Sequence, residues 1–166
     1  IQLRESLNYL RGKRVLITGA GGSIGSEISR QLLSGGAERI YLFGHGENSI
    51  VAIYRELMVL QKEGVGEKAT VVPIIGDMKD RTYVEYIIKQ TKCDVIFHCA
   101  AYKHVDMMEA NPVAVMENNV LGTKNLLDAA LNHNVSRFVL ISTDKAVSPV
   151  CTYGFSKMIC EKLVLD

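Results

Sequence analysis

Three glycines in a short run of the chain constrain its fold more than any other feature. The run Thr-Gly-Ala-Gly-Gly-Ser-Ile-Gly places Gly19, Gly22 and Gly25 at equal spacing, after the apolar stretch Val-Leu-Ile and before a segment of helical period. A glycine turn between a strand and a helix lets the backbone approach an anion at the positively polarised start of the helix. The run therefore predicts a phosphate-binding loop, with Ser23 and Ile24 opening the helix; the alternative is a glycine-rich turn without a ligand.

Apolar runs and helical segments alternate along the rest of the chain. Runs rich in Val and Ile predict strands over residues 14–18, 39–43, 70–75, 94–99 and 137–142. Helical periodicity predicts helices over residues 23–33, 47–62, 81–90, about 107–132 and 153–165. Because the strands lack polar alternation, helices are expected on both faces of the sheet. The expected fold is α/β, a doubly wound parallel sheet of the Rossmann type that binds a dinucleotide.

The bulk composition limits the alternatives. With 166 residues and 48% hydrophobic content, the chain can enclose one domain. A formal charge of +1 provides no global attraction to nucleic acid or membrane, so we predict no nucleic-acid partner. The cysteines form no C-x-x-C pair, which favours a reducing cytoplasm, and no stretch approaches the roughly 20 apolar residues of a membrane span. His98 has no metal-ligand partner at a suitable spacing, so we expect it to bond locally and predict no metal site.

Both ends of the chain look like cuts. The chain starts at Ile1 rather than Met and stops at Asp166 within a helical pattern. We therefore expect residues 1–166 to be one NAD(P)-binding domain of a longer protein, truncated before a further region. Within it, residues 1–12 are expected to be a linker from an upstream region.

The residues after the second expected strand bear on the choice of dinucleotide. About 20 residues past the glycines, NAD-binding chains carry an acidic residue that binds the adenosine ribose. This chain has Gly44 there, then His45, and its next helix starts with Glu47 and Asn48. Without a carboxylate to repel it, a 2′-phosphate could meet His45 and the start of this helix, with Asn48 among the contacts. We predict NADP; the alternative is that Glu47 turns back to the ribose and NAD binds.

Further cofactor contacts are predicted where the third and fourth strands end. Asp77 and Met78 follow the third strand, and Asp77 could accept a hydrogen bond from the adenine amino group. Its alternative role is to cap the next helix, for which Asp80 is closer. Ala100 and Ala101 follow the fourth strand, where small side chains leave room for the ribose.

Residues with acid–base chemistry follow the fifth expected strand. Thr143, Asp144 and Lys145 come first, and Tyr153 and Lys157 follow, four positions apart. On the last expected helix this pair would share one face, so the ammonium would lower the phenol pKa and make tyrosinate available as a base. Thr143 adds a hydroxyl, and Asp144 with Lys145 adds an acid and a base. Alternatively, Asp144 stabilises a turn and Lys145 is solvated.

These motifs resemble the extended short-chain dehydrogenase/reductase superfamily and, within it, bacterial nucleotide-sugar 4,6-dehydratases of polysaccharide biosynthesis. The resemblance spans nearly the whole chain and is carried by residues 12–27, 100–105, 118–123 and 142–146. The short gap from Asp144 to Tyr153 favours the dehydratases, since general sugar epimerases place the Tyr farther downstream. Two departures concern Tyr153, which is Met in some membrane-tethered members, and Gly44, which is an acid in many.

The resemblance implies a substrate: UDP-N-acetylglucosamine or a related UDP-N-acetylhexosamine, with Lys103 among its contacts. It also implies a homo-oligomer when the protein is full length. The family's substrate-binding region follows the Tyr-Lys helix, where this chain stops, so the isolated domain is expected to bind cofactor without turnover. Residues 3–7 resemble the linker of long members, which leaves a membrane-tethered parent open, with this domain in the cytoplasm.

The resemblance further implies a catalytic cycle that regenerates its cofactor. Tyr153, assisted by Lys157 and Thr143, would take the proton of the sugar 4-hydroxyl while hydride passes to NAD(P)+. Lys145 would remove the C5 proton, Asp144 would protonate the leaving 6-hydroxyl, and hydride would return to C6. An epimerase of the same superfamily and a non-catalytic dinucleotide-binding module are the alternatives.

Overall fold

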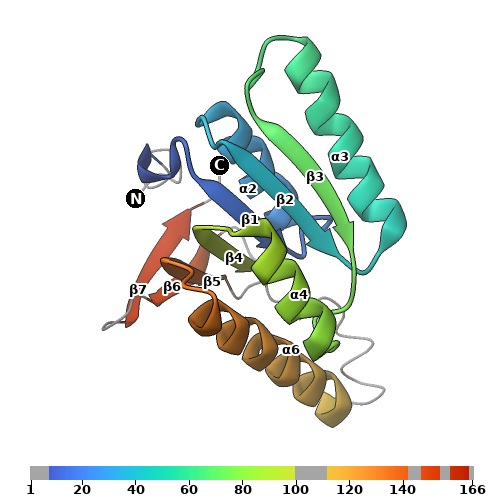
Figure 1. Cartoon of the computed structure of the whole chain (residues 1–166), viewed down its shortest axis with the longest axis vertical. Coiled ribbons are helices and arrows are strands. Elements are labelled where there is room, and N and C mark those ends of the chain that lie inside the picture. Colours follow the sequence, from blue (N-terminus) through green and yellow to red (C-terminus); the bar gives the residue numbers. More distant parts are fainter. Residues whose placement is uncertain (1–7, 100–111, 142–146, 154–157, 165–166) are drawn as a thin grey trace.

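Five parallel strands lie side by side in one sheet of the computed structural model, which describes residues 8–99, 112–141, 147–153 and 158–164 (Figure 1). The strands are β1 (Arg14–Thr18), β2 (Arg39–Gly44), β3 (Thr70–Ile75), β4 (Val95–Cys99) and β5 (Arg137–Ile141). The helices between them are α2 (Ser23–Ser34), α3 (Glu47–Lys62), α4 (Arg81–Thr91) and α6 (Pro112–Asn132). All five predicted strands and the first four predicted helices are confirmed.

The order of the strands defines where a ligand can bind. The sheet runs β3-β2-β1-β4-β5, and the pairs among these five strands are parallel. From β1 the chain adds β2 and β3 on one side. After α4 it returns to the other side of β1 and adds β4 and β5 there. Ligands of such sheets bind beyond the carboxyl ends of the strands at this reversal, here between β1 and β4.

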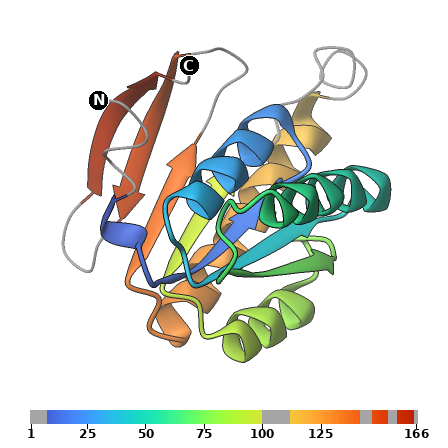
Figure 2. The same cartoon turned by 90° about the horizontal axis from the view of Figure 1, so that it is seen from above.

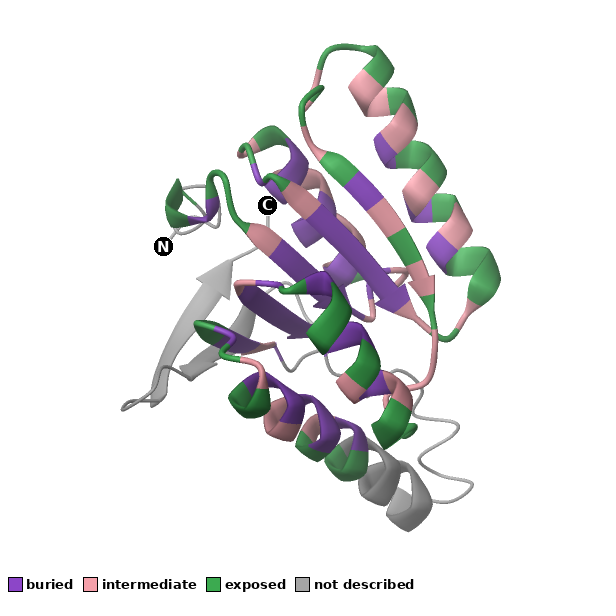
Figure 3. Ribbon diagram, in the orientation of Figure 1, coloured by how far each residue is buried: buried purple, intermediate pink, exposed green. Residues whose placement is uncertain are grey.

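Helices cover both faces of the sheet, as expected for a doubly wound fold. Val15 and Ile17 of β1 enter a core formed with α2 and α3, whereas Leu16 between them enters a second core formed with α4 and α6. Figure 2 shows the two helix layers on opposite sides of the strands. The central strands are buried and the outer helix surfaces are exposed (Figure 3). Burial on both faces explains why these strands are continuously apolar.

The short 3-10 helix η1 (Asn8–Leu10) packs against the domain ahead of β1. Leu10 is fully buried in the α2/α3 core, and the guanidinium carbon of Arg137 lies 4.3 Å from the ring centroid of Tyr9. The last residues of the segment expected to be a linker are thus part of the packed structure. Among the described residues, none of the helices has both the length and the apolar character needed to cross a membrane.

The C-terminal residues differ from the prediction. The strand β6 (Val147–Tyr153) pairs antiparallel with β5, and β7 (Met158–Val164) pairs antiparallel with β6. The helix predicted over residues 153–165 is therefore wrong in its described part. The residues predicted as a helix instead form β7, which pairs with β6, and β6 in turn covers an edge of β5 whose backbone groups would otherwise be unpaired.

This change of element also removes one geometric premise. Tyr153 is the last residue of β6, and Lys157 lies outside the described residues. The spacing of four residues between them thus does not place both on one helical face, and any pairing of phenol and ammonium rests on the resemblance alone.

Candidate dinucleotide site

Gly19 makes the turn that leaves β1, as its position in the motif predicts. Its φ of +64° lies in the left-handed region, and the amide of Gly22 donates to its carbonyl oxygen at 3.0 Å. A Cβ atom at Gly19 would lie 2.7 Å from the backbone oxygen of Cys99 at the end of β4. Only glycine satisfies both the conformation and this close approach between the two central strands.

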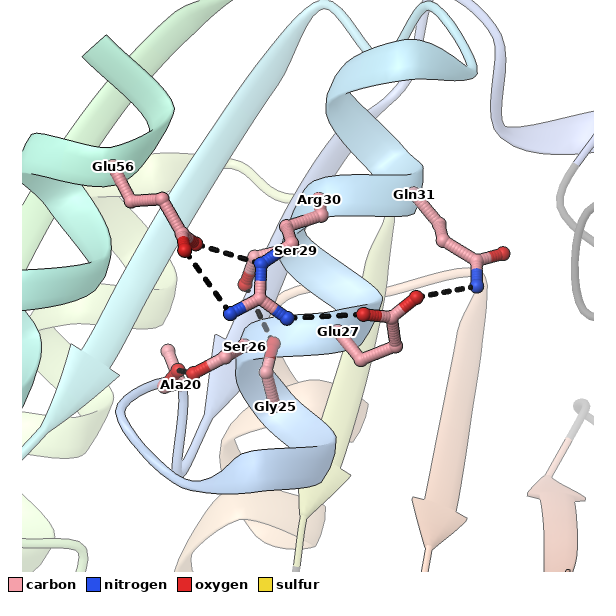
Figure 4. A network of polar contacts seen from close by, with 8 residues as sticks. All are labelled: Ala20, Gly25, Ser26, Glu27, Ser29, Arg30, Gln31 and Glu56. Carbon is pink, nitrogen blue, oxygen red and sulfur yellow. Dashed lines mark hydrogen bonds and ion pairs between the residues drawn. The ribbon is translucent and has the colours of Figure 1, made fainter. Parts of the chain in front are cut away.

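Gly25 allows α2 to pack directly on the same turn. A Cβ atom at Gly25 would collide with the carbonyl oxygen of Gly19 and would lie 2.8 Å from the Cα of Ala20. The hydroxyl of Ser26 donates to the carbonyl of Ala20 at 3.1 Å, which ties the first turn of α2 to the loop (Figure 4). Gly19 and Gly25 thus have the mechanical roles that a phosphate loop requires.

The starts of α2 and α3 differ from the start of α4. Within the described part of the chain, no side chain caps α2 or α3, which begin after Gly22 and Gly46, whereas the Asp80 carboxylate accepts from the Tyr83 amide at 3.1 Å and caps α4. Asp80 is therefore the cap of α4, and Asp77 is not. Uncapped amides at the positive end of a helix are suited to a phosphate group. Of the residues predicted to open α2, Ser23 is exposed and Ile24 packs on the core.

The residues at the end of β2 are arranged around the first turn of α3. A Cβ atom at Gly44 would lie 2.7 Å from the Cδ1 of Ile50, so the side chain of Ile50 occupies the space beside this residue. A Cβ atom at Gly21 would collide with Ser49, which brings the phosphate loop against the same turn. His45 and Asn48 are both exposed at this edge. The close contact between Gly21 and Ser49 was not predicted, and the spacing of the motif contains no signal for it.

The loop after β3 is held by its own charges and by α6. One oxygen of Asp77 accepts from the Lys79 amide at 2.9 Å, and the other lies 3.7 Å from the Lys79 ammonium nitrogen. The Asn125 side-chain amide donates to the carbonyls of Met78 and Lys79 at 2.9 and 3.2 Å. The role of Asn125 was missed, although the residue falls on the buried stripe of α6 formed by Gly122, Leu126, Ala129 and Ala130.

His98 bonds locally, as expected. Its Nδ1 lies 2.6 Å from the Thr18 hydroxyl and its Nε2 lies 2.9 Å from the Thr123 hydroxyl of α6. The imidazole is 1% exposed, and this burial lowers its pKa to about 4. His98 is thus a neutral ring that connects β1, β4 and α6.

The remaining predicted site residues lie outside the described part of the chain; they are Ala100, Ala101, Lys103, Thr143, Asp144, Lys145 and Lys157. Their sequence positions follow strands that end together, since Cys99 pairs with Ile141 in parallel β4 and β5. Within the described residues, no three His, Cys, Asp or Glu side chains form a group that could hold a metal ion.

Nearly the whole chain matches one family of known proteins. The model of the family described as polysaccharide biosynthesis protein matches residues 15–166, which include the whole Gly loop and every strand, apart from Arg14, the first residue of β1. The chain belongs to this family. The match confirms the resemblance to the polysaccharide-biosynthesis branch of the extended short-chain dehydrogenase/reductases.

Relatives of the chain include a polysaccharide biosynthesis protein, a dehydratase and an epimerase. The chain is 44% identical to the capsular polysaccharide biosynthesis protein CapD of Staphylococcus aureus, over 93% of the chain and 25% of that protein. It is 31% identical to an inverting UDP-N-acetylglucosamine 4,6-dehydratase of Campylobacter jejuni, over 92% of the chain and 42% of the enzyme. A UDP-glucose 4-epimerase of Rickettsia rickettsii is 29% identical over 92% of the chain and 43% of the enzyme. The chain thus spans from a quarter to less than half of the length of these relatives.

Solved structures confirm the Rossmann-type fold. The epimerase Mth375 of Methanothermobacter thermautotrophicus superposes with a TM-score of 0.66 at 26% identity, over 92% of this chain and 40% of that one. A UDP-glucose 4-epimerase of Stenotrophomonas maltophila, solved with bound NAD, gives a TM-score of 0.67 at 23% identity, over 81% of this chain and 38% of that one. The latter comparison concerns the fold alone.

Proposed function

We propose that this chain is the NAD(P)-binding domain of a nucleotide-sugar 4,6-dehydratase that acts on a UDP-N-acetylhexosamine in polysaccharide biosynthesis. The observation that carries the proposal is the similarity to the Campylobacter dehydratase, which extends over 92% of the chain. The geometry of Gly19 and Gly25 supports it, because both residues have the close contacts expected of a phosphate loop. UDP-N-acetylglucosamine is the substrate that we propose to test.

In this proposal the chemistry belongs to residues that follow β5. Tyr153, with Thr143 and Lys157, accepts the proton of the sugar 4-hydroxyl. Lys145 then takes the proton from C5, which the new 4-ketone has made acidic, and Asp144 gives a proton to the leaving 6-hydroxyl. A dinucleotide held at the glycine loop would supply reversible hydride transfer between C4 and C6, and a proton would return to C5, so no external reductant would be consumed.

The full-length protein incubated with UDP-N-acetylglucosamine tests this function. Mass spectrometry is expected to find a nucleotide sugar that has lost one water. Asp144→Asn and Lys145→Ala variants are expected to lose this product while still binding cofactor, because they remove the acid and the base of the elimination. Elimination at the wild-type rate in both variants would contradict the assigned roles.

NADP is the cofactor that we propose. Three features support it: Gly44 offers no carboxylate to repel a 2′-phosphate, His45 is exposed beside it, and the start of α3 lacks a side-chain cap. Titration of the full-length protein with each dinucleotide is expected to show tighter binding of NADP+. His45→Ala is expected to weaken NADP+ binding by roughly ten-fold, the effect of one charge-assisted hydrogen bond, and to leave NAD+ binding unchanged. Tighter binding of NAD+ would refute this choice.

A sugar epimerase is the second candidate function. It is favoured by the 29% identity to the Rickettsia UDP-glucose 4-epimerase and by the structural similarity to other epimerases. The same mass measurement separates the two, because an epimerase yields a product of unchanged mass with altered stereochemistry. A protein that binds dinucleotide and leaves every UDP-sugar unchanged would instead be a binding module.

A further inference from the structure

One turn of α6 contacts the loop after β3 and is linked, through His98 of β4 and Thr18 of β1, to the start of the phosphate loop. On one side, the Thr123 hydroxyl lies 2.9 Å from Nε2 of His98, whose Nδ1 lies 2.6 Å from the Thr18 hydroxyl. Thr18 immediately precedes Gly19, the residue that makes the turn of the phosphate loop. Through two side-chain contacts, α6 is therefore connected to the start of that loop.

The same turn also holds the loop after β3. The Asn125 side chain is 1% exposed and donates to the carbonyl oxygens of Met78 and Lys79. A Cβ atom at Gly122 would lie 3.1 Å from the Cβ of Met78, so the helix backbone packs closely against this loop. The hydrogen bonds from Asn125 and the close approach of Gly122 to Met78 together fix the position of the loop relative to α6.

Burial makes both connections sensitive to the loss of one partner. A neutral imidazole has one donor and one acceptor nitrogen, so the two threonine hydroxyls satisfy both. Thr18 and His98 are 0% and 1% exposed, so the imidazole nitrogens themselves have little access to water. Deleting one hydroxyl would leave a buried nitrogen unpaired, which costs more than the net value of the hydrogen bond.

We propose that the turn Gly122–Asn125 of α6 is a positioning element that sets the spacing between the phosphate loop and the loop after β3, and thereby the affinity for the adenosine-diphosphate half of the dinucleotide. Thr123 and Asn125 act through the two loops and not by touching the ligand. The inference rests on the proposed dinucleotide binding. It adds a second layer of residues that the spacing of the glycines does not reveal.

Titration of the full-length protein with ADP, NAD+ and NADP+ tests the proposal. Thr123→Val, which deletes the hydroxyl, is expected to weaken ADP binding by roughly three- to ten-fold, the range for one hydrogen bond. Thr123→Ser, which keeps the hydroxyl, is expected to restore the wild-type affinity. Tyr41→Phe is the matched control, because it deletes a buried hydroxyl that donates to the Thr91 carbonyl, in the same α4/α6 core but in neither loop.

A second arm separates positioning from stability. Gly122→Ala is expected to push Met78 away and to weaken ADP binding several-fold, while the higher helix propensity of alanine offsets part of the cost of this shift to the free energy of unfolding. Amide hydrogen exchange should accelerate at residues 18–22 in Thr123→Val and at residues 77–79 in Asn125→Asp. If Asn125→Asp does not fold, the Thr123 and Gly122 variants still decide the question.

The outcomes are distinguishable. If the wild-type protein binds none of the three nucleotides, the proposed function fails and the positioning role fails with it. The wild-type protein could instead bind the nucleotides while Thr123→Val and Gly122→Ala bind ADP as tightly as Tyr41→Phe does. That result would overturn the positioning role, and the cofactor proposal would stand. Weaker binding in both variants, with rescue by Thr123→Ser, supports the positioning role.

Discussion

His98 shows how burial sets the charge of a single residue. Folding lowers its pKa from 6.5 to about 4, so between these values the unfolded chain binds a proton that the folded protein does not. The contribution of His98 to the free energy of unfolding is therefore fully present above the unfolded pKa. It is lost as the pH falls toward the folded pKa. The loss is expected to be about 2 kcal/mol between about pH 7 and about pH 5.

Denaturant unfolding of the wild type and of His98→Gln at both pH values checks this expectation. Glutamine cannot take up the proton, so the variant should show a smaller fall in the free energy of unfolding over the same interval. Carboxylates that titrate in this range contribute equally to both proteins and cancel in the difference. An identical fall in the two proteins would show that His98 is not protonated on unfolding.

Gly19 and Gly12 allow conformational strain to be separated from close approach. Both have positive φ values, +64° and +74°, but a Cβ atom at Gly12 meets nothing within 4 Å, whereas one at Gly19 lies 2.7 Å from the Cys99 oxygen. Gly12→Ala is expected to cost about 1–2 kcal/mol of stability and to leave cofactor affinity unchanged. Gly19→Ala is expected to cost more and to abolish dinucleotide binding; equal behaviour of the two variants in thermal unfolding and titration would contradict the close approach.

At the scale of elements, the pair α2 and α3 is joined by a surface network. The guanidinium of Arg30 donates to Glu56 of α3 at 2.7 Å and to Glu27 at 3.0 Å, and Glu27 also accepts from Gln31 (Figure 4). The Arg30 and Glu56 side chains are 39% and 45% exposed. Because exposed ion pairs are screened by water and salt, Glu56→Gln should change the free energy of unfolding by less than about 1 kcal/mol. A larger loss that persists at high salt in urea unfolding would contradict this estimate.

At the scale of the whole molecule, one sheet is shared by two cores. Cys99 lies in the α2/α3 core and Cys93 in the α4/α6 core, and both are buried. Burial also raises the pKa of the Cys93 thiol to about 11, so a thiol reagent should modify it only after the structure opens. Because the strands belong to both cores, we expect the two cores to open together. The free energy of opening derived from the labelling rate should therefore be the same for both cysteines. Peptide mapping by mass spectrometry measures each rate, and much faster labelling of one cysteine would show that the two faces open independently.

The sequence by itself determined the five parallel strands, the first four helices and the glycine turn between β1 and α2. These features depend on local physics: apolar periodicity decides strand or helix, and the spacing of Gly19, Gly22 and Gly25 decides the turn. Asp80 as the cap of α4 follows from equally local chemistry. The family resemblance was confirmed on the same residues.

Only the tertiary structure decided what residues distant in sequence do to one another. Three sets of contacts depend on which elements lie side by side. They are the hydrogen bonds of His98 with Thr18 and Thr123, those that Asn125 donates to the loop after β3, and the close approach of Gly21 to Ser49. The helix predicted over residues 153–165 is wrong in its described part for the same reason. Helical spacing is a local preference, whereas residues 158–164 form a strand by pairing with β6, which itself pairs with the edge of β5, and that edge exists only once the sheet has formed.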